Sequence, residues 1–240
     1  MKHRVTNDQV IKAWTEATDY VVSKFTDEGD FYRQHVLNKA LFDLLGTVKG
    51  KKILDSGCGE GYLSRMLSKK GAIVTGLEPA HGLIQHAIET EKKENLGIEY
   101  IEKDLSEWEG KKSTFDIVVS NMVFMDIPDW KPAMRNCINT LKPKGVFVFS
   151  ISHPCFDIPG KWESEKPHVK VTNYFNEYTI QNYIGPSFHR MLSSYVNFLS
   201  ENGCYITQML EPSVPEKAIE KKNLRDRNIP NFLLIKAVKM

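Results

Sequence analysis

The sequence has no long hydrophobic run, few cysteines and no large excess of one charge. No segment approaches the roughly 18 uninterrupted apolar residues of a membrane-spanning helix, and the start, MKHRVTNDQV, has no apolar stretch of the signal-peptide type. We therefore expect a cytoplasmic protein without a membrane partner. Its four cysteines are scattered and form no CxxC pair, so we expect neither a metal site nor a disulfide framework.

The charges are nearly balanced, with 32 basic and 30 acidic residues and a net charge of +2. A dedicated nucleic-acid-binding protein normally carries a clear basic surplus, so no nucleic-acid partner is expected. The basic stretch EKAIEKKNLRDR contains interleaved acids, which is typical of a solvated helix face. At 240 residues, with 41% hydrophobic and 26% charged residues, the chain fits one globular domain, either as a monomer or as a homodimer.

Apolar strands and helical patterns alternate from residue 52 onward. The first forty-five residues predict helices, with one stripe from Val10 to Phe25 and a second that ends at Gly46. The predicted strands are KILD, AIVTGLE, IEYIEKD, FDIVVSN and, after a KPKG turn, GVFVFSIS. Strands that are apolar on both faces and separated by helices indicate a parallel sheet covered on both sides, a doubly wound, Rossmann-like α/β fold.

This alternation stops at residue 153. Residues 153–188 contain four prolines and the alternating stretch HVKVTNYFNEYTI, which predicts one or two extra strands. A helix then ends at Gly203, and the strands CYITQMLE and NFLLIKAVK follow, joined by a polar helix. We expect one domain over residues 1–240, with a helical cap (1–48), a core (49–152), an insertion on the substrate side (153–188) and the rest of the sheet (189–240).

The stretch KILDSGCGEGYLSRML joins a predicted strand to a helix through three closely spaced glycines, Gly57, Gly59 and Gly61. Glycines at this position allow a bend and a close approach of backbone to a ligand. The dinucleotide fingerprint GxGxxG is not matched, because the third glycine comes one residue early and the bulky Tyr62 follows. A nicotinamide-dependent oxidoreductase is therefore a weaker alternative.

Polar residues stand at the ends of four successive strands. Asp55 ends the first, and Glu78 ends the second, where a carboxylate can accept hydrogen bonds from both ribose hydroxyls. Asp104, next to Leu105, ends the third and can receive an adenine amino group, and Asn121 and Met122 leave the fourth. Taken singly, the acids could be a helix cap, a solvated strand end and a turn residue. Together they indicate a nucleoside at one edge of the sheet.

Five motifs in this order resemble those of class I S-adenosylmethionine-dependent methyltransferases. They are LDSGCGEGYLS, VTGLEPA, EKDLSEW, FDIVVSNMVFMDI and LKPKGVFVFS, within residues 50–152. The C-terminal segments HRMLSSYVNFLSENGCYITQMLEP and NFLLIKAVKM are similar to the end of small-molecule members, the ubiquinone-biosynthesis-like (type 11) branch. The resemblance implies a seven-stranded sheet with its last strand antiparallel, and methyl transfer from S-adenosylmethionine to a small organic acceptor, with S-adenosylhomocysteine as the product.

The resemblance also assigns cofactor contacts. It implies that Asp55 and the three loop glycines line the methionine part, and it places Glu78 at the ribose with Pro79 beside it. The remaining contacts are Asp104 and Leu105 at the adenine, and Asn121 and Met122 near the sulfonium. A noncatalytic module that binds S-adenosylmethionine and, at lower weight, an RNA methyltransferase remain alternatives.

A general base helps when the acceptor is a protonated nucleophile, and an imidazole suits that role. His153 and His189 flank the insertion and are the candidate catalytic residues, although each could equally be a packed or capping side chain. Arg33, in the turn GDFYR, is suited to binding a carboxylate, and Tyr20 and Tyr32 are further candidate contacts. The insertion aromatics could cover the acceptor or simply pack the core.

Overall fold

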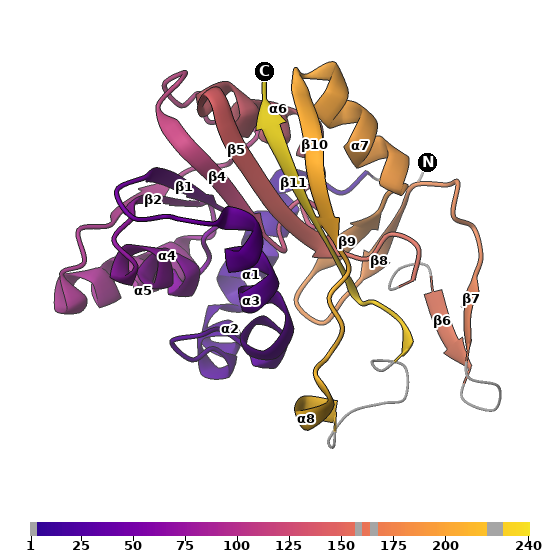
Figure 1. The fold of residues 1–240 in the computed structure, drawn as a ribbon. Coiled ribbons are helices and arrows are strands. Elements are labelled where there is room, and N and C mark those ends of the chain that lie inside the picture. The colour runs from indigo at the N-terminus through magenta and orange to yellow at the C-terminus, as the bar shows by residue number, and fades with distance from the viewer. Residues whose placement is uncertain (1–3, 157–159, 164–167, 220–227) are drawn as a thin grey trace.

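Seven strands form one twisted sheet in the computed structural model, which describes all residues except 1–3, 157–159, 164–167 and 220–227 (Figure 1). The order across the sheet is β10-β11-β5-β4-β1-β2-β3. The strands are β1 (Lys52–Ser56), β2 (Ile73–Glu78), β3 (Glu99–Glu102), β4 (Phe115–Asn121), β5 (Leu141–Ser152), β10 (Cys204–Leu210) and β11 (Phe232–Lys239). The predicted Rossmann-like sheet is confirmed.

The sheet is parallel from β3 to β5, and β11 runs antiparallel between β5 and β10. Central strands such as β1 and β4 are almost wholly buried, as apolar parallel strands covered on both faces should be. The predicted KPKG turn lies inside β5, which already begins at Leu141, and Lys144 has a left-handed φ of 63° there. The carboxyl ends of these five parallel strands therefore share one edge, where ligands bind in such sheets.

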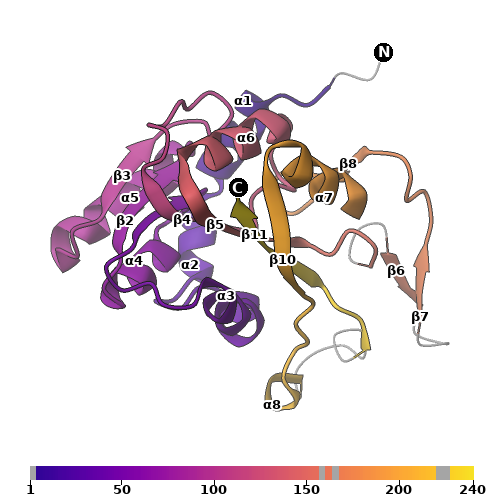
Figure 2. The same cartoon turned by 45° about the horizontal axis from the view of Figure 1, so that its top comes forward.

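Helices cover both faces (Figure 2). The helices of the core are α3 (Asn38–Leu45), α4 (Tyr62–Lys69), α5 (His81–Glu94), α6 (Trp130–Thr140) and α7 (Leu192–Glu201), and a short α8 (Glu216–Ile219) precedes β11. The apolar faces of α3 and α4 pack on one side of the sheet, and those of α6 and α7 on the other. No helix among the described residues is both long and apolar enough to cross a membrane.

The N-terminal helices lie over the ligand edge of the sheet. They are α1 (Asn7–Glu16), α2 (Thr18–Lys24) and a short π-helix, η1 (Arg33–Leu37), that continues into α3. Thr6 starts α1 with a capping box to Gln9, which supplies two otherwise unpaired backbone donors with partners. The stripe from Val10 to Phe25 is not one continuous helix, because α1 ends at Glu16 and α2 begins at Thr18. Thr18 packs directly against Gly82 of α5.

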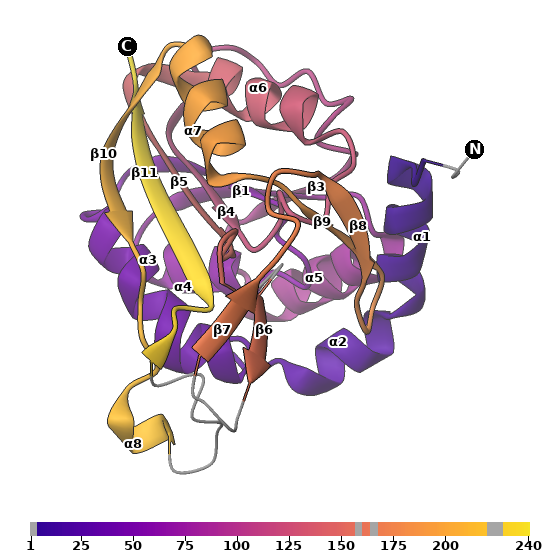
Figure 3. The same cartoon turned by 90° about the vertical axis from the view of Figure 1, so that its right-hand side faces the viewer.

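The insertion forms two hairpins, where the sequence predicted one or two strands. They are β6 (Gly160–Glu163) with β7 (His168–Val171), and β8 (Tyr178–Gln181) with β9 (Pro186–His189). The alternating stretch HVKVTNYFNEYTI breaks at Asn173, whose φ of 60° produces a turn and divides the stretch between β7 and β8. Figure 3 shows β8 and β9 lying toward α1, away from β6 and β7.

Phe149 on β5 is a sensitive point of the core, because it is fully buried and its ring contacts those of Phe124, Phe147 and Tyr195. We predict that Phe149→Ala lowers the free energy of unfolding by about 3–5 kcal/mol, because it leaves a large cavity. Urea unfolding measures this loss. The control Phe175→Ala, at a side chain 83% exposed, should change it by less than about 0.5 kcal/mol. Equal losses in both variants would contradict this account of the core.

Candidate functional site

A cavity of about 930 Å³, including the solvent at its mouth, lies at the carboxyl ends of β1, β2 and β4 and is covered by α1 and α2. The predicted cofactor residues line it with one exception, Gly61: they are Asp55, Gly57, Gly59, Glu78, Pro79, Asp104, Leu105, Asn121 and Met122. Residues from four separate segments of the core thus meet at one site.

The three glycines of the loop serve three different purposes. Gly57 has a φ of 73°, and a Cβ there would lie 2.5 Å from Val123. Gly61 starts α4 with a φ of 88°, and a Cβ there would lie 2.5 Å from the hydroxyl of Tyr100, so it permits close packing behind the loop. Gly59 has a φ of 56°, but no atom lies within 4 Å of its Cβ position. Gly59 therefore leaves room for a ligand at the backbone of the loop.

Asp55 is buried at the end of β1, where its Oδ2 accepts a 2.6 Å hydrogen bond from Ser64 in α4. Burial raises its pKa to about 7, and the Ser64 hydrogen bond opposes the rise. The residue at the N-cap of α4 is Gly61, not Asp55. Asp55 thus lies at the cavity as a carboxylate that sits close to its protonation midpoint at neutral pH.

Glu78 is buried at the end of β2, with 8% exposure, and is not a solvated strand end. Its Oε2 accepts a 3.1 Å hydrogen bond from the amide of Gly59, and its Oε1 a 2.9 Å bond from the amide of Ala80. Burial raises its pKa to about 7, while these two amides lower it. The side chain is therefore held in one orientation, joining the glycine loop to the end of the neighbouring strand.

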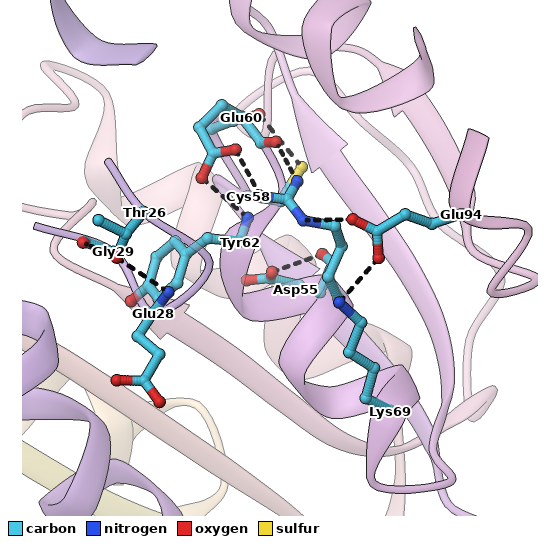
Figure 4. Close-up of polar contacts among 12 residues, drawn as sticks. Thr26, Glu28, Gly29, Asp55, Cys58, Glu60, Tyr62, Lys69 and Glu94 are labelled. Carbon is cyan, nitrogen blue, oxygen red and sulfur yellow. Dashed lines mark hydrogen bonds and ion pairs between the residues drawn. The ribbon is translucent and has the colours of Figure 1, made fainter. Parts of the chain in front are cut away.

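A buried ion pair supports the same loop. Arg65 contacts Glu60 through Nη2 and Oε2 at 2.8 Å and also donates to the Glu60 carbonyl at 2.7 Å. Glu60 accepts a further bond from the amide of Tyr62 (Figure 4). Glu60 lines the cavity, and the sequence analysis did not select it. The sequence did contain a signal for this ion pair, because Glu60 and Arg65 carry opposite charges on either side of the start of α4.

Asp104, in the loop after β3, is held by both local and distant contacts. Its Oδ1 accepts from the amide of Ser106 at 2.8 Å, which is the turn bond expected of such an acid. Its Oδ2 accepts at 2.8 Å from Asn7 in α1. The Asn7 side-chain oxygen in turn accepts from the amide of Asp129 at 3.1 Å. Asn7, which the sequence analysis missed, therefore fastens α1 over this end of the cavity.

A chain of hydrogen bonds runs through the end of β4. Ser150 donates to Asn121 at 2.5 Å, and the Asn121 amide group donates to the Tyr62 hydroxyl, also at 2.5 Å. The next residue, Met122, has a left-handed φ of 62°, a strained conformation for a non-glycine residue. Tyr62 lines the cavity, and burial raises its pKa, so its hydroxyl is neutral. The residue that broke the dinucleotide fingerprint is thus part of the site.

Arg33 and Asp126 add charge to the cavity lining. Arg33 pairs with Asp30 at 2.8 Å, and its guanidinium lies 4.8 Å from the ring centre of Phe25. Arg33 is among the residues predicted from the sequence, whereas Asp126, in the segment after β4, is not. Tyr20 and Tyr32, the other N-terminal candidates, lie outside the lining; Tyr20 contacts the ring of Tyr183 instead.

His153 and His189 also lie outside the residues that line the cavity. His153 is buried, with its Nε2 2.8 Å from Oε1 of Glu211 and its Nδ1 accepting from the amide of Cys155. His189 is buried with its Nε2 2.8 Å from the carbonyl oxygen of Tyr174. These contacts place both imidazoles at the base of the insertion. Their catalytic role stays a prediction.

The insertion aromatics whose side chains are described also lie outside the cavity lining. Phe175 and Tyr183 are 83% and 85% exposed. The insertion instead reaches the cavity through polar contacts, because Ser187 on β9 donates a hydrogen bond to Asp126. The side chain of Trp162 lies outside the described residues.

Comparison with known proteins points to one family. Residues 54–149 match the family model described as a methyltransferase domain. The ubiquinone biosynthesis O-methyltransferase of Coxiella burnetii is 38% identical over 104 residues, which is 43% of this chain and 44% of that protein. The Escherichia coli protein of the same name is 29% identical over 160 residues, 62% of this chain and 63% of the relative. The chain thus matches less than two thirds of the length of these relatives.

Solved structures agree in fold. An S-adenosylmethionine-dependent methyltransferase from Mesorhizobium loti has a TM-score of 0.76 and 26% identity, covering 84% of this chain and 96% of that one. A Burkholderia thailandensis N1-methyltransferase with bound S-adenosylhomocysteine has a TM-score of 0.63 and 17% identity, covering 100% and 93%, a likeness of fold alone. Over residues 54–149 and in the order of its strands, this chain is therefore similar to S-adenosylmethionine-dependent methyltransferases.

Proposed function

We propose that this protein transfers the methyl group of S-adenosylmethionine to a small organic acceptor and releases S-adenosylhomocysteine. The observation that carries the proposal is the arrangement at the glycine loop. The buried Glu78 carboxylate is held by the Gly59 amide, and the open Cβ position of Gly59 leaves space for a ligand beside it. The methyltransferase domain match over residues 54–149 supports it independently.

The residues that would hold the cofactor follow from this arrangement. Glu78 would accept hydrogen bonds from the ribose hydroxyls, since both of its oxygens lie at the end of β2. Asp55 and Gly59 would contact the methionine part, Asp104 with Leu105 the adenine, and Asn121 with Met122 the region of the sulfonium. Buried carboxylates with raised pKa values suit the hydroxyl and ammonium donors of such a ligand, because those donors offset the cost of burying the charge.

S-adenosylmethionine, when bound, supplies a methyl group already activated by the positive sulfonium. The chain then has to hold the acceptor in line and exclude water, and such positioning can contribute ~7–11 kcal/mol to lowering a barrier. The apolar side chains of the lining exclude water; they include Val10, Ile11, Trp14, Val21 and Phe25 from the N-terminal segment.

We propose a small-molecule acceptor because the curated relatives are named as O-methyltransferases of ubiquinone biosynthesis. The cavity is lined by both polar strand ends and apolar helix side chains, which suits a polar cofactor beside a small organic acceptor. The near-balanced charge supports a protein without a nucleic-acid partner. We further propose one cytoplasmic domain over residues 1–240, acting as a monomer or a homodimer without a membrane partner.

Ligand-induced stabilisation tests the cofactor assignment. We predict that S-adenosylhomocysteine raises the melting temperature and NADH does not, because only a ligand bound by the folded state stabilises it. Gly59→Ala should weaken binding of S-adenosylhomocysteine at least about tenfold, because the new methyl group enters the cavity. A tenfold change in affinity corresponds to a loss of only ~1.4 kcal/mol of binding free energy.

Gly97→Ala is the matched control, because Gly97 also has a positive φ, 77°, an open Cβ position and an exposed site outside the cavity lining. Both substitutions carry a similar backbone strain, but Gly97→Ala should leave the dissociation constant from calorimetry unchanged. No binding of S-adenosylhomocysteine by the wild-type protein would refute the proposed function.

The raised pKa of Glu78 predicts a pH dependence of binding. The pKa of Glu78 is about 7, so most of this side chain is protonated at lower pH. Hydrogen bonds from the ribose hydroxyls require the carboxylate form. The affinity for S-adenosylhomocysteine should therefore rise by about tenfold from pH 6 to pH 8 for one such group. Calorimetry on Glu78→Gln should show a flatter dependence, and Glu99→Gln, at an exposed carboxylate on β3, the wild-type one. An affinity that falls with rising pH would contradict the assignment.

Asn7 should control how long the cofactor stays bound, because its side chain ties α1 to Asp104 and to the amide of Asp129. Asn7 also donates to the Ser106 hydroxyl at 2.8 Å, so Asn7→Ala removes three hydrogen bonds of the α1 segment. We predict that it speeds release of S-adenosylhomocysteine by at least about fivefold, which corresponds to the loss of one such bond at ~1 kcal/mol. Stopped-flow displacement measures this rate. The neighbouring exposed Asp8 is the control, and Asp8→Asn should release the ligand at the wild-type rate.

A further inference from the structure

Asp126 is a charged residue of the cavity that the cofactor assignment does not use. It lies five residues after Asn121, in the segment that follows β4, and it lines the same cavity as Arg33 and Tyr62. The cofactor roles proposed above fall on the strand ends and on the glycine loop. The polar surface formed by Arg33, Tyr62 and Asp126 is therefore available for the acceptor.

The insertion orients the Asp126 side chain. Ser187 on β9 donates to Oδ1 of Asp126, and Asn182 donates to the Ser187 hydroxyl at 2.6 Å. Among the described residues no hydrogen bond reaches Oδ2 of Asp126. The carboxylate is half-buried. It thus has one oxygen fixed by the insertion and one oxygen with no protein partner in the described part of the chain.

The backbone around Asp126 is held as firmly as its side chain. Arg190 is buried, and its guanidinium donates to the carbonyl oxygens of Phe124 at 2.7 Å and Ile127 at 2.6 Å. The amide of Phe188 donates to the Met125 carbonyl at 2.8 Å. A planar guanidinium that spans two carbonyls fixes the segment rigidly. Asp126 is therefore positioned by the end of the insertion, which explains why this segment packs on the core.

Several groups set the protonation of Asp126. Ser187 from β9, Arg33 from η1 and Arg190 after β9 all favour the carboxylate, and the neutral Tyr195 of α7 lies close enough to be influenced by it. Burial outweighs these contributions and raises the pKa of Asp126 to about 7. A carboxylate with a pKa near the working pH is well suited to exchange a proton.

We propose that Asp126 is the general base of the reaction and accepts the proton of a hydroxyl-bearing acceptor. The inference rests on the proposed methyltransferase function. The acceptor O–H bond breaks and its proton passes to a carboxylate oxygen of Asp126. The oxygen's electron pair forms the bond to the methyl carbon, the pair of the broken carbon–sulfur bond stays on sulfur, and Asp126 later returns its proton to water.

Arg33 favours a hydroxyl over an ammonium acceptor. A hydroxyl that loses its proton develops negative charge, which the guanidinium of Arg33 stabilises in the weakly screened cavity. An ammonium group has no lone pair with which to attack the methyl carbon, and it develops no negative charge for Arg33 to stabilise. The apolar helix α1 and Phe25 on the other walls suit an acceptor with an apolar body.

Phenol, as a neutral hydroxyl probe, tests the inference in the presence of saturating S-adenosylhomocysteine. We expect phenol to bind at least about tenfold more weakly to Asp126→Asn than to the wild type, as for loss of a hydrogen bond to a charged group. Asp129→Asn is the matched control, since Asp129 lies three residues further on, outside the cavity lining, and pairs with Arg4.

Carbon-13 NMR of labelled aspartate gives a second readout that does not depend on turnover. The Asp126 carboxyl resonance, identified by its absence in Asp126→Asn, should titrate near neutral pH and shift when phenol binds. Ser187→Ala should raise this pKa, because the serine hydrogen bond favours the carboxylate. The S-adenosylhomocysteine affinity of each variant should match that of the wild type, which shows that the fold is intact.

The outcomes separate the two proposals. Wild-type protein that binds S-adenosylhomocysteine but neither binds phenol nor shows an Asp126 shift would overturn the role of Asp126 and leave methyl transfer standing. Equal phenol affinity in wild type and Asp126→Asn would overturn it as well. Failure of the wild type to bind S-adenosylhomocysteine would instead refute the proposed function.

Discussion

The hydrogen bond between the Glu78 carboxylate and the Gly59 amide links the two strand ends on which the site depends. It joins the loop after β1 to the end of β2, while the parallel register of β1 with β2 and β4 keeps those ends level. The same carboxylate binds the Ala80 amide before α5. One buried side chain thus fixes the loop, the second strand and the start of the next helix relative to one another, and the cavity forms beside them.

Burying the Glu78 carboxylate costs free energy, and two other acids of the cavity carry a similar cost. Burial raises the pKa values of Asp55, Glu78 and Asp126 to about 7 each. Their folded-state pKa values exceed the ordinary ones, so the folded chain binds more protons than the unfolded chain between about pH 4 and pH 7, and stability falls as the pH rises through this range. A ligand with hydroxyl and ammonium donors would offset that penalty, whereas the Glu60–Arg65 pair already has its opposite charge inside the protein.

Two segments outside the α/β core complete the cavity from opposite sides. From the N-terminus, α1 reaches Asp104 through Asn7, and from the insertion, β9 reaches Asp126 through Ser187. The two segments also touch each other, since the rings of Tyr20 and Tyr183 lie 4.9 Å apart. The core supplies the strand ends, and these two segments decide how much of the cavity remains open and which charged groups face an acceptor.

The sequence by itself determined the α/β class, the alternation of strands and helices along the core and the polar residues at the strand ends, because period, glycine spacing and strand-end acids are local signals. The antiparallel last strand followed from the family resemblance. Only the tertiary structure placed Asn7 on Asp104, Ser187 on Asp126 and the two histidines outside the cavity lining. The Asn7 and Ser187 contacts join residues 97 and 61 positions apart. No periodicity or short motif can encode such pairs, because they arise when separately folded segments pack on the same edge of the sheet.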